Sequence, residues 1–174
     1  RIIRRRIINT ILLNAEKHQL MDIVAERFLR EKRNSDILAA ILGYALEARC
    51  GEGGTHMNGA GHLTKLLLLE LCKRTDRYAL EPDDIELIST AAGLHDIGKV
   101  LIPESILKKP GKLTAAEFEL VKQHTTLGAR LVAEMPAYQN EALVKYIIEI
   151  CLRHHERWNG EGYPDGLRGD ECPI

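Results

Sequence analysis

Helical periodicity is the feature that most constrains the fold of this 174-residue chain. Apolar residues recur every three or four positions over most of its length, whereas the strict alternation typical of half-buried strands is almost absent. Near the N-terminus these apolar positions run from Ile3 to Phe28. We therefore predict an all-α protein that opens with one long helix, or two helices in series, over residues 2–33.

Capping residues and helix breakers divide the rest of the chain. The further predicted helices cover, approximately, residues 36–49, 55–73, 82–95, 114–135 and 140–154. Ser35 suits the N-cap of the first of these and Asn140 that of the last, while Pro82 suits the first turn of the third. Thr114 and Glu117 have the spacing of a capping box. The segments rich in Gly and Pro are predicted to be loops, at residues 102–112 and 157–174.

Charge and cysteine content exclude several classes of protein. Lys and Arg total 24 against 25 Asp and Glu, so a general binder of nucleic acid polymers, which would be markedly basic, is not expected. The four cysteines form no CxxC pair, which favours reduced thiols in the cytoplasm. No apolar run reaches the roughly 18 residues of a membrane span, so we expect no membrane insertion. Since the sequence begins at Arg1 without a Met, we expect it to be a piece of a longer protein.

Histidines are the most informative residues of the chain. Five of its seven histidines lie on predicted helices or at their ends, namely His56, His95, His124, His154 and His155. Helix bundles build metal sites by projecting such side chains inward from several helices. Imidazole combined with carboxylate suits transition metals such as Fe, Mn or Zn. The pattern therefore favours a metal centre inside a helical bundle.

The residues alone leave plainer interpretations open. A buried pair such as His95 and Asp96 is costly unless both side chains are satisfied, which a metal or ordinary core hydrogen bonds can achieve. His154 and His155 close an apolar helix, where they can be ligands or two exposed polar residues. Lys99 can equally be a solvated cation favoured by the C-terminal end of a helix dipole.

Two motifs carry a family resemblance. The run AGLHDIGK at residues 92–99 resembles the HD superfamily of metal-dependent phosphohydrolases. The run HHERWNGEGYPDGL at residues 154–167 is similar to the HHExxxGxGYP motif of the HD-GYP subfamily, and His124 lies between the two. The resemblance covers about residues 35–174, with residues 1–34 as an N-terminal linker helix. It implies an HD-superfamily helical bundle that opens cyclic di-GMP to linear pGpG and carries it on to GMP.

The resemblance also implies a role for each matching residue. Asp96 bridges two metal ions, and Lys99 is a catalytic residue beside the scissile phosphate. The terminal ligands are the five histidines already named. Glu52, four residues before the first of them, matches a carboxylate of the family's three-metal members, so two or three ions are implied, usually iron or manganese. The implied substrate-binding loop beside the site comprises Gly162, Tyr163 and Pro164.

Two departures from the family pattern stand out. The family's last metal ligand is an Asp beyond the GYP loop, and the sequence ends at Ile174 before reaching it. Asp165 and Asp170 do not stand in its place. We expect either that the C-terminal part of the domain is missing or that the centre is incomplete. Residues 58–61, rich in Gly, replace an Arg that usually follows the first ligand His, which puts one phosphate or partner contact into question.

The N-terminal third has a resemblance of its own. Its RRRIINT run and the residues through His18, Gln19 and Leu20 resemble the linker helix that follows a receiver domain in two-component response regulators. The same segment can also be a generic amphipathic helix with a solvated Arg cluster. A receiver domain upstream would make this chain an output domain, and the helix would pair in a homodimer, although its spacing is not a clean heptad.

Three functions remain compatible with these motifs. The first is a metal-dependent cyclic di-GMP phosphodiesterase in bacterial signal transduction. The second keeps the metal chemistry and acts on another cyclic dinucleotide or nucleotide, because the motifs do not read the base. The third is a non-catalytic nucleotide-sensing or interaction module. Only the absent C-terminal Asp favours the third, and truncation explains that absence as well.

Overall fold

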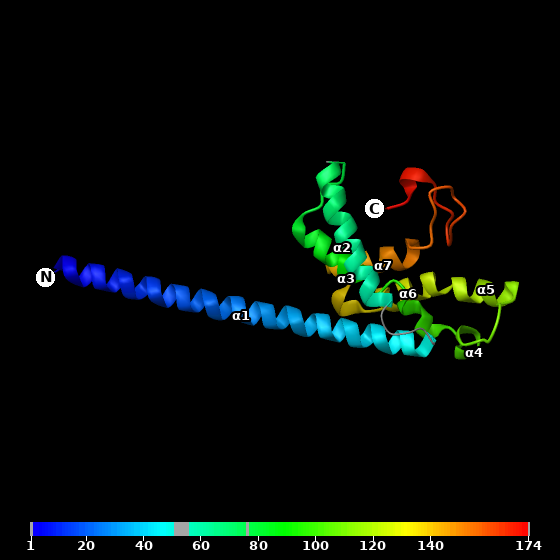
Figure 1. The fold of residues 1–174 in the computed structure, drawn as a ribbon, viewed down its shortest axis with the longest axis horizontal. Helices are drawn as coiled ribbons and strands as arrows, with labels where there is room; N and C mark the ends of the chain where they lie inside the picture. The colour runs from blue at the N-terminus through cyan, green and yellow to red at the C-terminus, as the bar shows by residue number, and fades with distance from the viewer. Residues whose placement is uncertain (1, 51–55, 76, 174) are drawn as a thin grey trace. The chain divides into compact units, whose positions relative to one another are not determined.

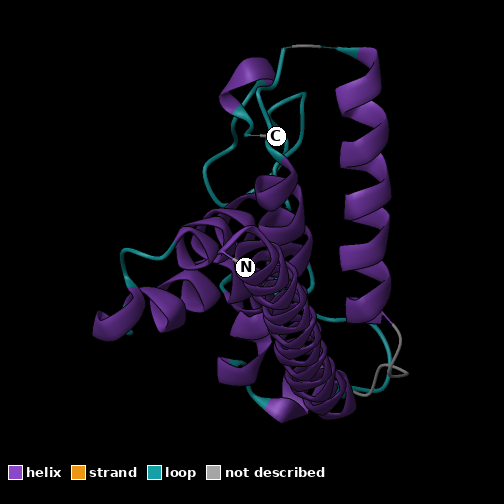
Figure 2. Cartoon of the chain, turned by 90° about the vertical axis from the view of Figure 1, so that its left-hand side faces the viewer, coloured by secondary structure: helices purple, strands orange, loops and turns teal. Residues whose placement is uncertain are grey.

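The computed structural model describes residues 2–50, 56–75 and 77–173, leaving aside the side chains of residues 2–12, 15 and 56–58. The regular elements are, in order, α1 (Ile2–Cys50), α2 (His56–Arg74), α3 (Pro82–Ala92), η1 (Ile97–Leu101), α4 (Glu104–Leu107), α5 (Ala115–Lys122), α6 (His124–Ala133), η2 (Pro136–Tyr138), α7 (Ala142–Arg153) and η3 (Gly169–Glu171). Within the described residues no strand forms, as Figure 2 shows, and the all-α prediction is confirmed. None of the helices described is long and apolar enough to span a membrane.

The chain divides into two compact units, Arg1–Ala39 and Ala40–Ile174. The first unit consists of the α1 residues up to Ala39, and its described side chains between residues 13 and 38 are all exposed. The boundary expected between residues 34 and 35 stays a prediction.

The helix break predicted before Asp36 was wrong. α1 continues through this region, because residues 30–36 contain neither Gly nor Pro and include several good helix formers. Ser35 does not cap a new helix. Its hydroxyl donates instead to the carbonyl of Glu31 at 3.1 Å, within the running helix.

α3, α6 and α7 form the centre of the second unit (Figure 1). α7 packs against both α3 and α6, and α2 packs against α3. The main apolar core consists of Ala91, Ala129, Val132, Val144, Ile147 and Cys151. The three α7 members of this core are spaced by three and four residues, so they share one face of that helix. A second cluster joins α2 to α3 through Leu68, Ile85 and Ile88.

Helix ends in the second unit decide where functional side chains stand. The predicted capping box is confirmed, since Thr114 accepts from the Glu117 N–H at 3.3 Å and Glu117 accepts from the Thr114 N–H at 2.7 Å. The helix that it opens is shorter than predicted, because α5 ends at Lys122 and α6 begins at His124. Asn140 was predicted wrongly as a cap, because Glu141 is the N-cap residue of α7.

Two further boundaries differ from the prediction. Pro82 begins α3 as expected, but the helix ends at Ala92 rather than near His95. The backbone then turns tightly into η1, which carries His95 out of the helix. The predicted loop over residues 102–112 contains the single helical turn of α4.

Candidate metal centre

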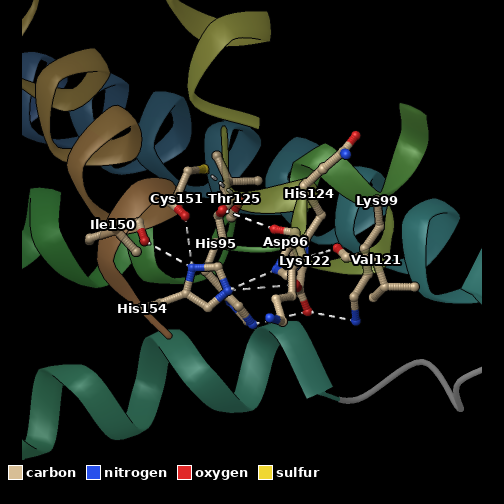
Figure 3. A network of polar contacts seen from close by, with 12 residues as sticks. His95, Asp96, Lys99, Val121, Lys122, His124, Thr125, Ile150, Cys151 and His154 are labelled. Atoms are coloured by element: carbon tan, nitrogen blue, oxygen red, sulfur yellow. Dashed lines mark hydrogen bonds and ion pairs between the residues drawn. The ribbon is translucent and has the colours of Figure 1, made fainter. Parts of the chain in front are cut away.

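Four side chains that are far apart in the sequence converge at one point of the second unit. One potential ligand atom from each of Asp96, His124, His154 and His155 lies within 4.8 Å of the others. Asp96 comes from the turn between α3 and η1, His124 is the first residue of α6, and the two other histidines follow α7. Asp96 and His124 are only 8% and 1% exposed. Figure 3 shows Asp96, His124 and His154 pointing toward one another.

A close backbone contact brings η1 and α6 together. A Cβ atom at Gly98 would lie 1.9 Å from the carbonyl oxygen of His124, and one at Gly128 would lie 3.0 Å from the Gly98 nitrogen. No side chain fits between the two segments at this point. The two glycines therefore allow Asp96 to approach His124 as closely as it does.

Backbone carbonyls fix the orientation of three imidazoles. Nδ1 of His95, His124 and His154 lies near the carbonyl oxygens of Ala92, Val121 and Ile150, at 2.7, 2.6 and 2.9 Å. Because a carbonyl only accepts, each Nδ1 must carry the proton and donate it. In the neutral ring Nε2 then keeps its lone pair, which is the arrangement that backbone partners impose on metal-binding histidines.

The Nε2 lone pairs of His124 and His154 lie close to each other and to Asp96. Nε2 of His124 lies 3.1 Å from Nε2 of His154, and 3.2 Å from Asp96 Oδ1. This buried Asp96 oxygen has no hydrogen-bond partner among the described residues. Neutral imidazoles and a carboxylate repel one another at these distances unless a cation or a proton lies between them. The donor set therefore fits a divalent metal ion.

The protonation states also favour ligation. Burial alone would raise the pKa of the Asp96 carboxyl, but hydrogen bonds from the imidazoles of His124 and His95, which need a proton on Nε2, outweigh it and hold that pKa well below the usual range. A cation among the ligand atoms would take the place of that proton. Burial, together with the neighbouring His155, lowers the pKa of His154 to about 4. Asp96 is thus ionised and His154 neutral near pH 7, which are the forms that bind metals.

His95 and Lys99 contact the second oxygen of Asp96. His95 Nε2 lies 3.2 Å from Asp96 Oδ2, and Lys99 Nζ lies 2.9 Å from the same atom. The His95 ring is also 5.0 Å, centroid to centroid, from that of His154. His95 therefore lies beside the four-residue cluster, although it is not a member of it. Lys99 brings an ammonium group to the edge of the site.

The GYP loop covers one side of the cluster. The Tyr163 ring stacks on the His155 ring, with centroids 4.5 Å apart and planes 20° apart. Lys122 Nζ lies 5.5 Å from the centroid of the same Tyr163 ring. Burial raises the pKa of Tyr163, so its hydroxyl stays protonated near neutral pH. Gly162 and Pro164 flank this tyrosine in the loop.

The side chains of two predicted ligands lie outside the described part of the chain. Glu52 lies outside the described residues, and His56 begins α2 but its side chain is not described. Asp165 and Asp170 do not join the cluster. They pair with Arg153 and Arg77, the latter at 2.6 Å.

Sequence reasoning missed three contributors to the site. The contact between Gly98 and Gly128 joins residues from different elements, so no local pattern announces it. Lys122 carries no distinguishing signal in the sequence, because a lysine on an amphipathic helix is typically a solvated cation. Glu156 belongs to the HHERWNGEGYPDGL run, and its position directly after His155 is the signal that could have identified it.

Comparison with known proteins places these residues in a family. Residues 19–174 match the family model of the HD domain. The chain belongs to the HD domain family. This HD domain is 40% identical over 168 residues to a probable cyclic di-GMP phosphodiesterase of Vibrio cholerae serotype O1, a match that covers 94% of the chain and 38% of that protein. Membership of the family named from the sequence motifs is thereby confirmed.

Two further relatives differ in their names. Over 144 residues the HD domain is 37% identical to the 3'3'-cGAMP-specific phosphodiesterase 2 of Vibrio cholerae, covering 82% of the chain and 25% of that protein. It is also 37% identical over 144 residues to a cyclic di-GMP phosphodiesterase response regulator of Xanthomonas campestris pv. campestris, covering 83% and 35%. The HD domain therefore spans less than two fifths of the length of these relatives.

Proposed function

We propose that this HD domain is a metal-dependent phosphodiesterase that hydrolyses cyclic di-GMP to pGpG, to GMP, or to both in bacterial signal transduction. The observation that carries the proposal is the convergence of Asp96, His124 and His154 with their lone pairs directed at one another. The names of the relatives support the substrate class. Both arguments concern the same residues, since the family match includes the whole cluster.

Iron or manganese suits the proposed centre best. Mg²⁺ prefers oxygen ligands, whereas this donor set is dominated by imidazole nitrogen. When bound, such ions polarise a phosphodiester and make a nucleophile available near neutral pH. We propose two or three ions, with Asp96 as the bridging ligand. The proposed terminal ligands are Glu52, His56, His95, His124, His154 and His155.

The number of metal ions per chain distinguishes a two-ion centre from a three-ion centre. Elemental analysis of protein purified without oxygen should give three ions per chain if Glu52 is a ligand, and the Glu52→Gln variant should then lose one of them. Two ions in both proteins would remove Glu52 from the centre and leave the rest of the ligand set intact.

Lys99 and the GYP loop are proposed to act on the substrate. The Lys99 ammonium, 2.9 Å from Asp96 Oδ2, lies where it can bind a phosphate oxygen and offset the negative charge that grows as the ester bond breaks. Tyr163, stacked on His155, presents an aromatic ring beside the cluster. Gly162 and Pro164 would shape the backbone around that ring.

A product assay tests the proposed reaction. Full-length protein loaded with Fe or Mn under reducing conditions should convert cyclic di-GMP to pGpG or GMP, measured by liquid chromatography. The His95→Ala variant should lose this activity. Intact cyclic di-GMP after incubation with the wild-type protein would contradict the proposal. Equal turnover by His95→Ala would point to a contaminating enzyme and revive a non-catalytic sensing or interaction role.

A mixed cyclic dinucleotide is the second candidate substrate, because one relative is named a 3'3'-cGAMP-specific phosphodiesterase. The proposed metal ligands act at the phosphate and do not distinguish one base from another. A side-by-side panel of cyclic di-GMP and 3'3'-cGAMP, compared by kcat/KM, decides between them.

We also propose that the chain is the output domain of a cytoplasmic response regulator and pairs through α1. A relative named a response regulator supports the first part. The second part is supported by Leu20, Val24 and Phe28, which follow one another at four-residue spacing and are 63, 59 and 67% exposed. A second copy of the same helix can cover such a stripe in a parallel pair.

A further inference from the structure

The loop after α7 is tied back to the end of the ligand segment by one carboxylate. Glu156 Oε1 accepts the backbone N–H groups of Asp165 and Gly166 at 2.8 and 3.2 Å, and Oε2 accepts that of Leu167 at 2.9 Å. Hydrogen bonds to an ionised acceptor are roughly twice as strong as neutral ones. Three of them on one side chain fix the far end of the loop to the residue that follows His155.

The near end of the loop lies against the same segment. The Tyr163 N–H donates to the carbonyl of His155 at 3.2 Å. A Cβ atom at Gly162 would lie 2.4 Å from the Arg157 nitrogen and 2.5 Å from Glu156 Cα, so only glycine fits there. The loop thus contacts residues 155–157 on both sides of Tyr163.

Tyr163 is held between these two attachments. Its ring stacks on His155 at 4.5 Å, and it lies only two residues before the first N–H bound by Glu156. Both Glu156 oxygens accept N–H groups of the loop, so the carboxylate is directed at the loop rather than at the four-residue cluster.

We propose that Glu156 is a positioning residue whose carboxylate anchors the GYP loop and thereby holds Tyr163 against His155. The anchoring follows from the chain's own contacts, whereas its effect on turnover rests on the proposed function. Glu156 acts through Tyr163 and is not itself a ligand in this proposal.

A tryptophan in the loop allows its mobility to be measured by fluorescence. Trp158 is the single tryptophan of the chain, and it is 70% exposed. Its fluorescence anisotropy reports loop mobility without any substrate, and trypsin cleavage at the exposed Arg157 and Arg168 reports loop opening. Glu161→Ala is the matched control, because that carboxylate belongs to the same loop and accepts only a local bond from Asn159, at 2.9 Å, among the contacts described.

Glu156→Ala should lower the anisotropy of Trp158 and speed cleavage at both arginines, while metal content stays at the wild-type level. Misplacing Tyr163 by about 1 Å should reduce kcat/KM by about 10- to 100-fold, mainly through a higher KM. Glu156→Gln should show a smaller effect, because its one amide oxygen still accepts two N–H groups while its NH₂ faces the third. Glu161→Ala should match the wild type in every measurement.

Wild-type anisotropy and cleavage rate in Glu156→Ala would overturn the anchoring role. Loss of metal equal to that of His155→Ala would show that Glu156 acts through the centre instead of the loop. If Glu156→Ala does not fold, Gly162→Ala replaces it, since the added methyl group displaces the loop from the same segment and leaves the carboxylate in place. A wild-type protein inactive on every cyclic dinucleotide would remove the proposed function, and the proteolysis result would still decide the anchoring.

Discussion

The two units of the chain use the same helical periodicity with opposite results. In α7, Val144, Ile147 and Cys151 recur at three- and four-residue spacing and are at most 7% exposed. In the first unit, Leu20 and Val24 recur at similar spacing and are 63 and 59% exposed. Helices in proteins draw most of their stability from the packing of an apolar face against a partner. Periodicity therefore predicts a helix in both units, but it does not reveal whether the partner belongs to the chain.

Polar residues sharpen the contrast. The second unit buries Asp96 and His124, although burying such groups costs free energy unless they are satisfied. In the first unit, none of the described side chains between residues 13 and 38 is buried. We therefore propose that the chemistry belongs to the second unit and that the first unit serves assembly. Variants in each unit test whether these two properties separate.

The largest effect is expected from Asp96→Ala. The carboxylate proposed to bridge two ions would serve both, so its removal should abolish turnover and lower the metal content. Product formation and elemental analysis of the same preparation measure both. Asp170→Ala is the control, because that exposed carboxylate pairs with Arg77 and should change neither quantity. Full metal occupancy in Asp96→Ala would remove the bridging role.

Lys99→Ala should divide catalysis from metal binding. The ammonium contacts Asp96 Oδ2 but is assigned to the phosphate, so metal content should stay unchanged. Turnover should fall by about 10²- to 10³-fold, the usual cost of losing one hydrogen-bond donor at a transition state. Lys112→Ala removes an exposed lysine and should leave kcat unaltered. Equal metal loss in Lys99→Ala and Asp96→Ala would contradict this division.

The sequence predicted which side chains converge better than it predicted their geometry. The order of the motifs was enough to name Asp96, His124 and His154, because residue type and spacing can be read directly from the sequence. The sequence did not predict that α5 ends before Gln123 and that His124 begins a new helix. The apolar positions of residues 114–135 follow a single helical periodicity, which does not indicate a break.

Local hydrogen bonds near helix ends and within helices explain two of the remaining misses. The tautomer of each imidazole depends on a backbone carbonyl exposed at a helix end, and the predicted ends were wrong by a few residues. The expected cap at Ser35 failed for a related reason. Its hydroxyl can satisfy a carbonyl within a helix as well as an N–H at a helix start, and nothing nearby forces the break.

Gly98→Ala tests the backbone contact that brings the two halves of the cluster together. The added methyl group would lie 1.9 Å from the His124 carbonyl, so η1 and α6 must separate. Overpacking of this kind costs about 1–3 kcal/mol, and the separation should also weaken metal binding. Gly59→Ala is the matched control, since its Cβ meets nothing within 4 Å. Urea unfolding and metal titration of both variants, compared with the wild type, measure the difference. Equal behaviour of the two variants would show that this contact does not hold η1 and α6 together.

The smallest effect on chemistry, and the largest on assembly, is expected in the first unit. Leu20, Val24 and Phe28 lie along one side of α1, so replacing all three with Ser should convert a dimer to a monomer in light scattering. The control replaces Asp22, Glu26 and Arg33 with Ser, because these exposed residues lie on the other side of the helix and should leave the mass unchanged. In both variants kcat per chain should stay at the wild-type value, since the ligand atoms of the cluster all come from the second unit. A monomeric variant that loses turnover would show that activity depends on the pairing of α1. Assembly and chemistry would then not be separate properties of the two units.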